Sequence, residues 1–346
     1  MMEQIIAWAE THVATSPELA YAGAAAIALA ALGLAWALAR GAIWTARRLI
    51  NQVTMRAVAQ DKSPGFRILL ASAGSGRANR FLRRALMEHL ERFSFGAPFQ
   101  LYSAGRLPAG HIRTEQAARA RLRRSEADMI LWGVRASGRA DGLKIHSISR
   151  GGGEPPEEAA RVTITASGAS ADWGEDFARM LAYQLAKALQ PALGRPESFQ
   201  PERVREIAAV LDALLRSEVA VSSGMRSALE DDFCAAALHI AEAGGDLTFV
   251  DAVIERRRAL IADTDRQERP VEQTQARLDL GRALLVKASR AFDAGLVQDA
   301  MAELDQAAAS IRGDLSIRRA QQATDAIARG RSLLETRKRF SLNFNG

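Results

Sequence analysis

The feature that most constrains how this chain can fold is a stretch without any charged side chain, residues 19–39, close to the amino terminus. It begins at Leu19, ends at Ala39 and consists mostly of Ala, Leu and Ile. As a helix rising about 1.5 Å per residue, it would span the roughly 30 Å hydrocarbon core of a bilayer. Trp36 and Trp44 lie near one boundary, where aromatic rings favour the membrane interface. We therefore expect one transmembrane helix that is anchored in a lipid bilayer.

The charges on the two sides of this stretch have opposite signs. Residues 1–18 carry acids and no Lys or Arg, whereas four arginines follow the stretch before the first acid: Arg40, Arg47, Arg48 and Arg56. Positively charged flanks stay on the cytoplasmic side of a membrane. The expected topology is a single-pass protein of the bacterial inner membrane, with residues 1–18 outside and the following domains in the cytoplasm.

Two other interpretations of the stretch are open. Ala37, Leu38 and Ala39 form the small-residue pattern of a signal-peptide cleavage site, but a signal peptide needs a basic amino-terminal region and a shorter apolar run. The stretch could instead be a buried helix of a soluble domain. Its length, and the arginines that follow it, favour the membrane anchor.

A first soluble domain is expected over residues 65–193, after a basic juxtamembrane segment and linker at 40–64. Short apolar runs bounded by turn residues predict strands, and apolar residues at helical spacing predict helices. The strands are expected at 66–72, 99–103, 129–134, 142–149 and 161–166, and the helices at 79–93, 114–126 and 175–189. The order β-α-β-α-β-β-β-α indicates an α+β module of two or three layers.

Three pieces of this domain carry a resemblance to a known family. They are residues 127–134 (Ala-Asp-Met-Ile-Leu-Trp-Gly-Val), residues 143–146 (Leu-Lys-Ile-His), and the final helix with its ending Leu189-Gln190-Pro191. Together they resemble the amino-terminal domain of TolB-type proteins over about 130 residues. The resemblance implies an interaction module and not an enzyme. The carboxy-terminal propeller of TolB has no counterpart in this chain, so the partners of TolB are not implied.

A glycine loop follows the first predicted strand, at the place where backbone N–H groups can hold a phosphate. Gly74, Gly76 and Arg77 are its candidate residues for phosphate or nucleotide binding. The loop does not match a phosphate-binding Walker motif, because Asn79 and Arg80 stand where Gly and Lys are required. It also lacks the third glycine of a dinucleotide fingerprint. A tight turn between strand and helix is the simpler interpretation.

No set of side chains predicts a catalytic or metal site, and no cofactor is expected. The five histidines have no partner at metal-ligand spacing, and the single cysteine, Cys234, lies in an apolar run typical of a protein core. The acids at 230–232 precede another apolar stretch, so we interpret them as charges at a helix start.

The second half of the chain is predicted to be entirely helical. A Pro-rich linker at 194–201 precedes a helical domain at 202–340, and a short tail follows at 341–346. Residues 288–311 resemble a tetratricopeptide-type hairpin, with small or apolar residues at Ala288, Phe292, Ala294, Gly295, Ala300, Leu304 and Ala307. An irregular helical bundle is the alternative, because a repeat array normally needs three copies.

The charge balance adds little about partners. The net charge of +6 is spread over several short arginine runs with acids among them, which favours a solvated surface over nucleic-acid binding. The sequence therefore predicts a membrane-anchored, non-enzymatic scaffold that binds another protein through its helical domain. The alternative is a regulator that responds to a nucleotide or phosphate through the loop at Gly74–Arg77. Ala-rich helices would also suit a homo-oligomer.

Overall fold

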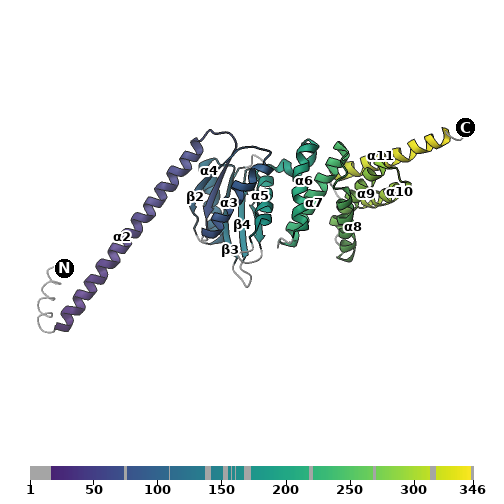
Figure 1. The fold of residues 1–346 in the computed structure, drawn as a ribbon. Helices are drawn as coiled ribbons and strands as arrows, with labels where there is room; N and C mark the ends of the chain where they lie inside the picture. The colour runs from purple at the N-terminus through teal and green to yellow at the C-terminus, as the bar shows by residue number, and fades with distance from the viewer. Residues whose placement is uncertain are drawn as a thin grey trace. The chain divides into compact units, whose positions relative to one another are not determined.

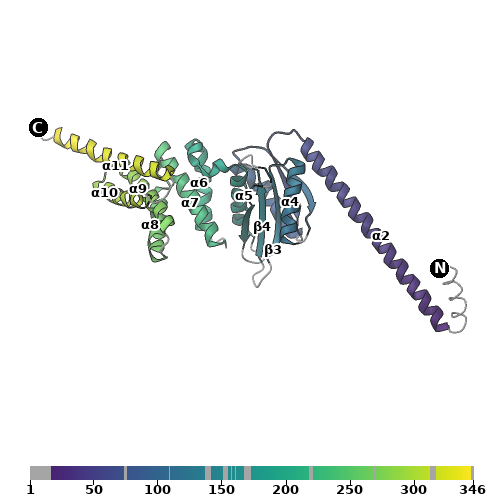
Figure 2. The same cartoon turned by 180° about the vertical axis from the view of Figure 1, so that it is seen from behind.

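The structure of the chain is a computed structural model that divides into two units, residues 1–61 and 62–346. It describes residues 17–73, 76–108, 110–136, 142–150, 155–156, 158–159, 161–166, 173–217, 221–267, 270–311 and 317–343. Figures 1 and 2 show the chain from two opposite sides. The two units are described separately.

The first unit contains one long helix, α2 (Pro17–Gln60). The uncharged stretch forms its first half, and the helix continues through Arg40 and the arginines beyond it instead of ending at Ala39. The guanidinium group of Arg40 lies 4.9 Å from the centre of the Trp36 ring. Trp36, Ala39 and Arg40 are exposed. Of the other predicted anchor residues, Leu19, Trp44, Arg47 and Arg48, the structure describes the helical backbone but not the side chains.

The predicted transmembrane helix is wrong. Within the described residues, no helix is both long enough and apolar enough to cross a membrane. The predicted single-pass location in the inner membrane, with the N-terminus outside and the later domains in the cytoplasm, is corrected with it.

The second unit begins with an α/β part built on one five-stranded sheet. Its strands are β1 (Phe66–Ser72), β2 (Phe99–Arg106), β3 (Met129–Ala136), β4 (Gly142–Ser149) and β5 (Arg161–Ala166). They lie in the order β2-β1-β3-β4-β5, in which β1 pairs in parallel with β2 and β3. β4 pairs antiparallel with β3 and β5. The carboxyl ends of the three parallel strands therefore meet at one edge of the sheet.

Helices cover both faces of this sheet (Figure 1). They are α3 (Gly76–Phe93), α4 (His111–Ser125) and α5 (Glu175–Leu189). From β1 the chain moves to β2 through α3, then crosses back over β1 to β3 through α4. Because such crossovers are right-handed, opposite directions place α3 and α4 on opposite faces. Since α5 packs against α3, the sheet is the middle of three layers.

The burial of side chains along β1 agrees with a sheet that is covered on both faces. Ile68 and Leu70 join the core formed with α3 and α5. Leu69 and Ala71 point the other way, as alternation along a strand requires, and are also fully buried. The order of elements in this part is the order expected from the sequence. The predicted fold also included one transmembrane helix, and the structure contradicts that part of the prediction.

The rest of the second unit is helical. Two short 3-10 turns, η2 (Pro191–Gly194) and η3 (Pro196–Ser198), lead into α6 (Pro201–Arg216) and α7 (Ser223–His239). A π-helical turn, η4 (Ile240–Gly244), extends α7. The remaining helices are α8 (Val250–Gln267), α9 (Pro270–Arg290), α10 (Ala294–Ile311) and α11 (Ile317–Asn343). From α8 onward, each helix packs against the next along the chain.

Helices α9 and α10 approach closely at a glycine. A Cβ atom added at Gly281 would lie 2.5 Å from Cγ of Leu304 and 3.1 Å from the carbonyl oxygen of Ala300. Ala288, Ala300, Leu304 and Ala307 of the predicted hairpin are fully buried, whereas Phe292 is 38% exposed. Small residues thus bring the two helices together.

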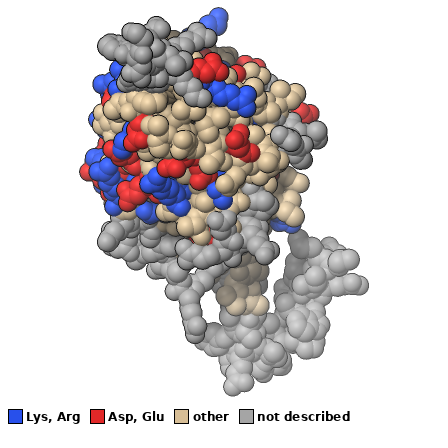
Figure 3. Space-filling model, turned by 90° about the vertical axis from the view of Figure 1, so that its right-hand side faces the viewer, with Lys and Arg blue, Asp and Glu red and all other residues tan. Residues whose placement is uncertain are grey.

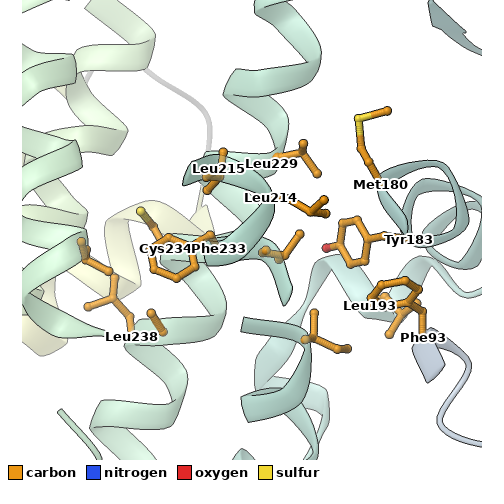
Figure 4. Close-up of a cluster of buried hydrophobic side chains, with 14 of the residues drawn as sticks. Phe93, Met180, Tyr183, Leu193, Leu214, Leu215, Leu229, Phe233, Cys234 and Leu238 are labelled. Atoms are coloured by element: carbon orange, nitrogen blue, oxygen red, sulfur yellow. The ribbon is translucent and has the colours of Figure 1, made fainter. Parts of the chain in front are cut away.

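One hydrophobic core joins the α/β part to the helical part. Tyr183 and Met180 of α5 belong to the same buried cluster as Leu229 and Phe233 of α7 (Figure 4). Leu193 of η2 lies in it too, so the segment between the two parts contributes to the core. The sheet and the helices of the second unit therefore share their apolar interior.

Candidate functional site: a charged groove among the helices

A groove of about 710 Å³ lies in the second unit among η3, α7, η4, α8, α9 and α11. Ionised side chains dominate its lining. The acids are Glu197, Asp231, Asp232, Glu242, Asp279 and Asp325. The bases are Arg257, Arg282, Arg318, Arg319 and Arg329. We call this feature the charged groove. Mixed charge is also visible on the face in Figure 3, where acidic and basic side chains are interspersed.

A buried ion pair forms the floor of the charged groove. Nη2 of Arg257 lies 2.8 Å from Oδ2 of Asp279, and these side chains are only 2% and 5% exposed. Nη1 of Arg257 lies 2.9 Å from Oδ1 of Asp231, which is half exposed. Charges removed from water need such partners, so Arg257 ties α8 to both α7 and α9.

Glu242 holds two arginines in the charged groove. Its two carboxylate oxygens accept hydrogen bonds of 3.0 and 2.8 Å from Nε and Nη2 of Arg282. Nη2 of Arg329 donates a third, of 3.1 Å, from α11. Burial alone would raise the pKa of Glu242, but Arg282 and Arg329 together lower it. Glu242 therefore remains a carboxylate and connects η4 with α9 and α11.

The π turn η4 places Glu242 in this position. It continues α7 for one wider turn and ends at Gly245, whose φ of 71° lies in the left-handed region that glycine adopts without strain. The carbonyl oxygen of Gly245 accepts a hydrogen bond of 2.7 Å from Arg290. Single π turns in α-helices occur frequently at functional sites.

Asp232 connects the charged groove to the α/β part. Nζ of Lys187, on α5, lies 2.7 Å from both carboxylate oxygens of Asp232, on α7. Burial raises the pKa of Asp232, and the charge of Lys187 opposes that effect. Tyr183 is hydrogen-bonded to the same carboxyl group, and burial raises the pKa of its phenol. The groove wall and the α5–α7 interface therefore share one carboxyl group.

Helix α11 supplies the outer wall of the charged groove. Its Ala323 and Ala326 are buried, and a Cβ atom at Gly330 would lie 2.5 Å from Sδ of Met301 on α10. Its groove side carries arginines. Arg318 pairs with Glu197 and Arg329 with Glu242, and both arginines are about half exposed, at 54% and 50%. The rim of the groove is thus made of ion pairs that solvent reaches.

The chemistry of these side chains suits binding of charged groups. The described residues contain no group of His, Cys, Asp and Glu arranged to hold a metal ion. Burial raises the pKa of Cys234 to about 12, so this thiol stays protonated at neutral pH. Nε2 of His239 lies 2.8 Å from the carbonyl oxygen of Phe199. Cys234 is thus buried in the core, as the sequence predicted, and His239 is engaged in contacts of the fold.

A second polar cluster lies on the sheet face that α4 covers. Glu115 of α4 accepts hydrogen bonds from Arg119, at 2.8 Å, and from Arg161 of β5, at 2.7 Å. Arg161 also lies 2.8 Å from Nε2 of His111. Next to them, Nδ1 of His146 lies 2.9 Å from Oγ1 of Thr163. Burial, followed by the charge of Arg161, lowers the pKa of His146 to about 4.

The candidate phosphate loop is only partly described. Helix α3 begins at Gly76, which is exposed, and Arg77 is exposed in its first turn. Gly74 lies outside the described residues. No atom lies within 4 Å of a Cβ placed at Gly76, so the start of α3 is open. The loop and the charged groove are built from separate elements.

Sequence reasoning missed the charged groove. Asp231 and Asp232 stand inside α7, which begins at Ser223, and not at a helix start as predicted. Arg257 belongs to a run that we interpreted as solvated surface, yet it is almost fully buried. The usable signal was three consecutive acids, residues 230–232, directly before the apolar residues 233–238. Similarity to other proteins does not assign the groove either, because no protein-family model, curated protein or solved structure matches the chain.

Proposed function

We propose that the chain is a non-enzymatic scaffold that binds another protein through the charged groove. The observation that supports this proposal is the groove itself, with a volume of about 710 Å³ and a lining of charged side chains from six elements. A groove between helices is a common place for a peptide or helix to bind.

The rim indicates the chemistry of the partner. Arg318 and Arg329 are half exposed, and solvent-exposed ion pairs contribute only about 0–1 kcal/mol each. A partner carboxylate can therefore replace Glu197, itself 50% exposed, as the partner of Arg318 at low cost. Asp231 and Asp325 can accept basic side chains in the same way. The expected partner carries charges of both signs, placed so that each lies opposite a groove side chain of the other sign.

We also propose that the two parts of the second unit are similar to known interaction modules. The element order and the antiparallel strands β3–β5 support a TolB-type amino-terminal domain. The close packing of α9 and α10 at Gly281 supports a tetratricopeptide-like hairpin. Both modules bind proteins, which agrees with the proposed scaffold.

A capture experiment with the full chain as bait tests the proposal. The groove variant carries Arg318→Glu and Arg329→Glu, which reverse both rim charges. The control variant carries Arg203→Glu and Arg258→Glu, two exposed arginines outside the groove lining, with the same change in net charge. We expect a stoichiometric partner that binds the wild-type chain and the control but not the groove variant.

Two outcomes would contradict the scaffold. A partner that binds the groove variant as well as the wild type would exclude the charged groove as its binding site. A substrate turnover that the full chain catalyses, and that Glu242→Gln or Asp279→Asn abolishes in a folded protein, would replace the scaffold by an enzyme.

The alternative proposal is a response to a nucleotide or phosphate at Gly76 and Arg77. Supporting it, the first turn of α3 contains no acid, so its N–H groups and Arg77 offer only positive charge. The test is a thermal shift of the full chain with millimolar ATP or phosphate. Gly76→Asp should remove the shift through its charge, since the added side chain meets no neighbouring atom. Absence of a shift in the wild type would exclude this function.

A further inference from the structure

The exposed face of helix α3 has an unusual arrangement of charge. Its amino-terminal half carries Arg80, Arg83 and Arg84, and its carboxy-terminal half carries Glu88 and Glu91. All five are exposed. This arrangement opposes the helix dipole, which favours acids near the amino terminus and bases near the carboxyl terminus. The charges therefore do not serve the stability of α3 itself.

These charges are also not used within the described part of the chain. Among the described residues, no ion pair involves Arg80, Arg83, Arg84 or Glu91, although Arg84 and Glu88 stand four residues apart on one helix. Glu88 has only a contact of 3.9 Å with Nε2 of His89. Arg92, further along, is already paired with Glu206 at 3.0 Å. Three bases (Arg80, Arg83 and Arg84) and two acids thus remain available on this face.

An exposed methionine lies between the two sets of charges. Met87 is 60% exposed, while the opposite side of α3 buries Leu82, Leu86 and Leu90. Positions 80, 84, 87 and 91 repeat at intervals of four, three and four residues, the spacing by which one helix packs along another. At this spacing the exposed face of α3 thus presents one apolar residue with bases on its amino-terminal side and acids on its carboxy-terminal side.

We propose that this face binds the same face of a second copy of the chain, with the two α3 helices antiparallel about a two-fold axis near Met87. A two-fold contact requires a surface that complements itself. In this arrangement Arg84 faces Glu88 of the second copy, Arg80 faces Glu91, and both pairs occur twice. Each base also approaches the carboxyl end of the neighbouring helix, where the dipole favours it.

The charge pattern selects this occupant over others. A nucleic acid or another polyanion would gain from the arginines but would be repelled by Glu88 and Glu91 on the same face. A second copy instead pairs both acids at once, Glu88 with Arg84 and Glu91 with Arg80. Because the contact consists of exposed ion pairs around one methionine, we expect a salt-sensitive dimer that dissociates at about 1 M salt, where the screening length is about 3 Å.

Charge-swap variants of the full chain test the proposal by sedimentation equilibrium. Variant A carries Arg80→Glu and Arg84→Glu, and variant B carries Glu88→Arg and Glu91→Arg. Variant B then presents only bases to its own copy, and variant A presents four acids and one base, Arg83, so we expect the dissociation constant of each to rise at least about tenfold. Both changes agree with the helix dipole, so loss of α3 does not explain such a result.

Mixing the variants gives the decisive measurement. Variant A and variant B complement each other at all four positions, so their mixture should form a heterodimer, and the fourfold swap in one chain should restore the homodimer. Arg203→Glu with Arg258→Glu is the control and should dimerise like the wild type. A wild-type chain that stays monomeric at low salt would overturn the proposal. A dissociation constant that is the same in the wild type, variant A and variant B would also overturn it. So would a mixture of variants A and B that fails to form a heterodimer.

Discussion

Among single residues of the charged groove, Arg257 is the buried cation on which the packing of α7, α8 and α9 depends. It is a charged side chain with 2% exposure, and it is held by Asp279, itself 5% exposed, and by Asp231. Removing one partner of a buried ion pair leaves the other charge in an apolar environment without compensation. The stability of the helical part is therefore expected to depend on this pair far more than on the exposed pairs of the rim.

Replacing Arg257 tests this dependence. We expect Arg257→Ala to lower the free energy of unfolding by about 3–5 kcal/mol, because the buried Asp279 then loses its closest cation and keeps only Gln275, at 2.9 Å, and Arg282, at 3.7 Å. Arg258→Ala is the matched control, since this neighbouring arginine is exposed, and its effect should stay within about 0.5 kcal/mol. Urea unfolding followed by circular dichroism measures both. Equal effects of the two substitutions would show that the buried pair adds no stability.

His146 should make the stability of the sheet depend on pH. Burial and the charge of Arg161 lower its folded-state pKa from 6.5 to about 4. Between these values the unfolded chain binds a proton that the folded chain does not, so stability is lost as the pH falls from about 6.5 towards about 4. His146→Asn keeps a polar group near Thr163 and removes the titration. The urea midpoint of this variant should fall less steeply over that range than that of the wild type, and parallel curves would refute the assignment.

At the level of elements, close contact between α9 and α10 depends on Gly281. Alanine normally favours a helix over glycine by about 1 kcal/mol. At this position the added Cβ would meet Leu304 at 2.5 Å and the backbone of Ala300 at 3.1 Å. In a Gly281→Ala variant, helix propensity would raise the free energy of unfolding and the packing clash would lower it. The sign of the measured change shows which effect is larger.

We expect Gly281→Ala to destabilise the chain by about 1–3 kcal/mol, the usual cost of overpacking a core. Gly224→Ala in α7 provides the control, because no atom lies within 4 Å of its Cβ position. That substitution should be neutral or stabilising. Thermal unfolding of the two variants gives the comparison, and a stabilised Gly281→Ala variant would mean that the helices separate easily.

Elements with one clear face could be predicted from the sequence, and arrangements between elements could not. The spacing of Phe81, Leu82, Leu86 and Leu90 predicted α3, and all four are buried. The absence of charge over 19–39 predicted a membrane helix, but that pattern did not reveal that α2 continues through the arginines. The charged groove was hidden for a related reason. Arg257, Glu242 and Asp279 come from different helices, and no spacing along the chain records that they meet.

At the scale of the whole molecule, the second unit has no independent halves. Tyr183, Leu229 and Phe233 lie in one core that spans α5 and α7, and Lys187 bonds to Asp232 across the same interface. Cutting the chain near Pro191 would expose apolar side chains of both parts. Binding studies therefore need the full chain as bait, and not its halves.

This shared core predicts that the sheet and the helices lose structure together. We expect Leu229→Ala, a large-to-small change at a 3% exposed position, to cost about 2–5 kcal/mol. Hydrogen exchange should then accelerate in peptides from both β1 and α8. Ile112→Ala, at a 71% exposed position on α4, is the control and should change neither. Faster exchange confined to α6–α8 would show two separately stable bodies.

The shared core also has a consequence for how the protein is made. When the ribosome has completed α5, the apolar side chains of Met180 and Tyr183 still lack the α7 residues that cover them. Roughly 50 further residues must be added first, which takes roughly 3–10 s at typical translation rates. During that interval the nascent chain exposes an apolar surface that can bind other unfolded chains. Synthesis of this protein should therefore depend on chaperones that act at the ribosome exit, more strongly than its finished, compact second unit would indicate.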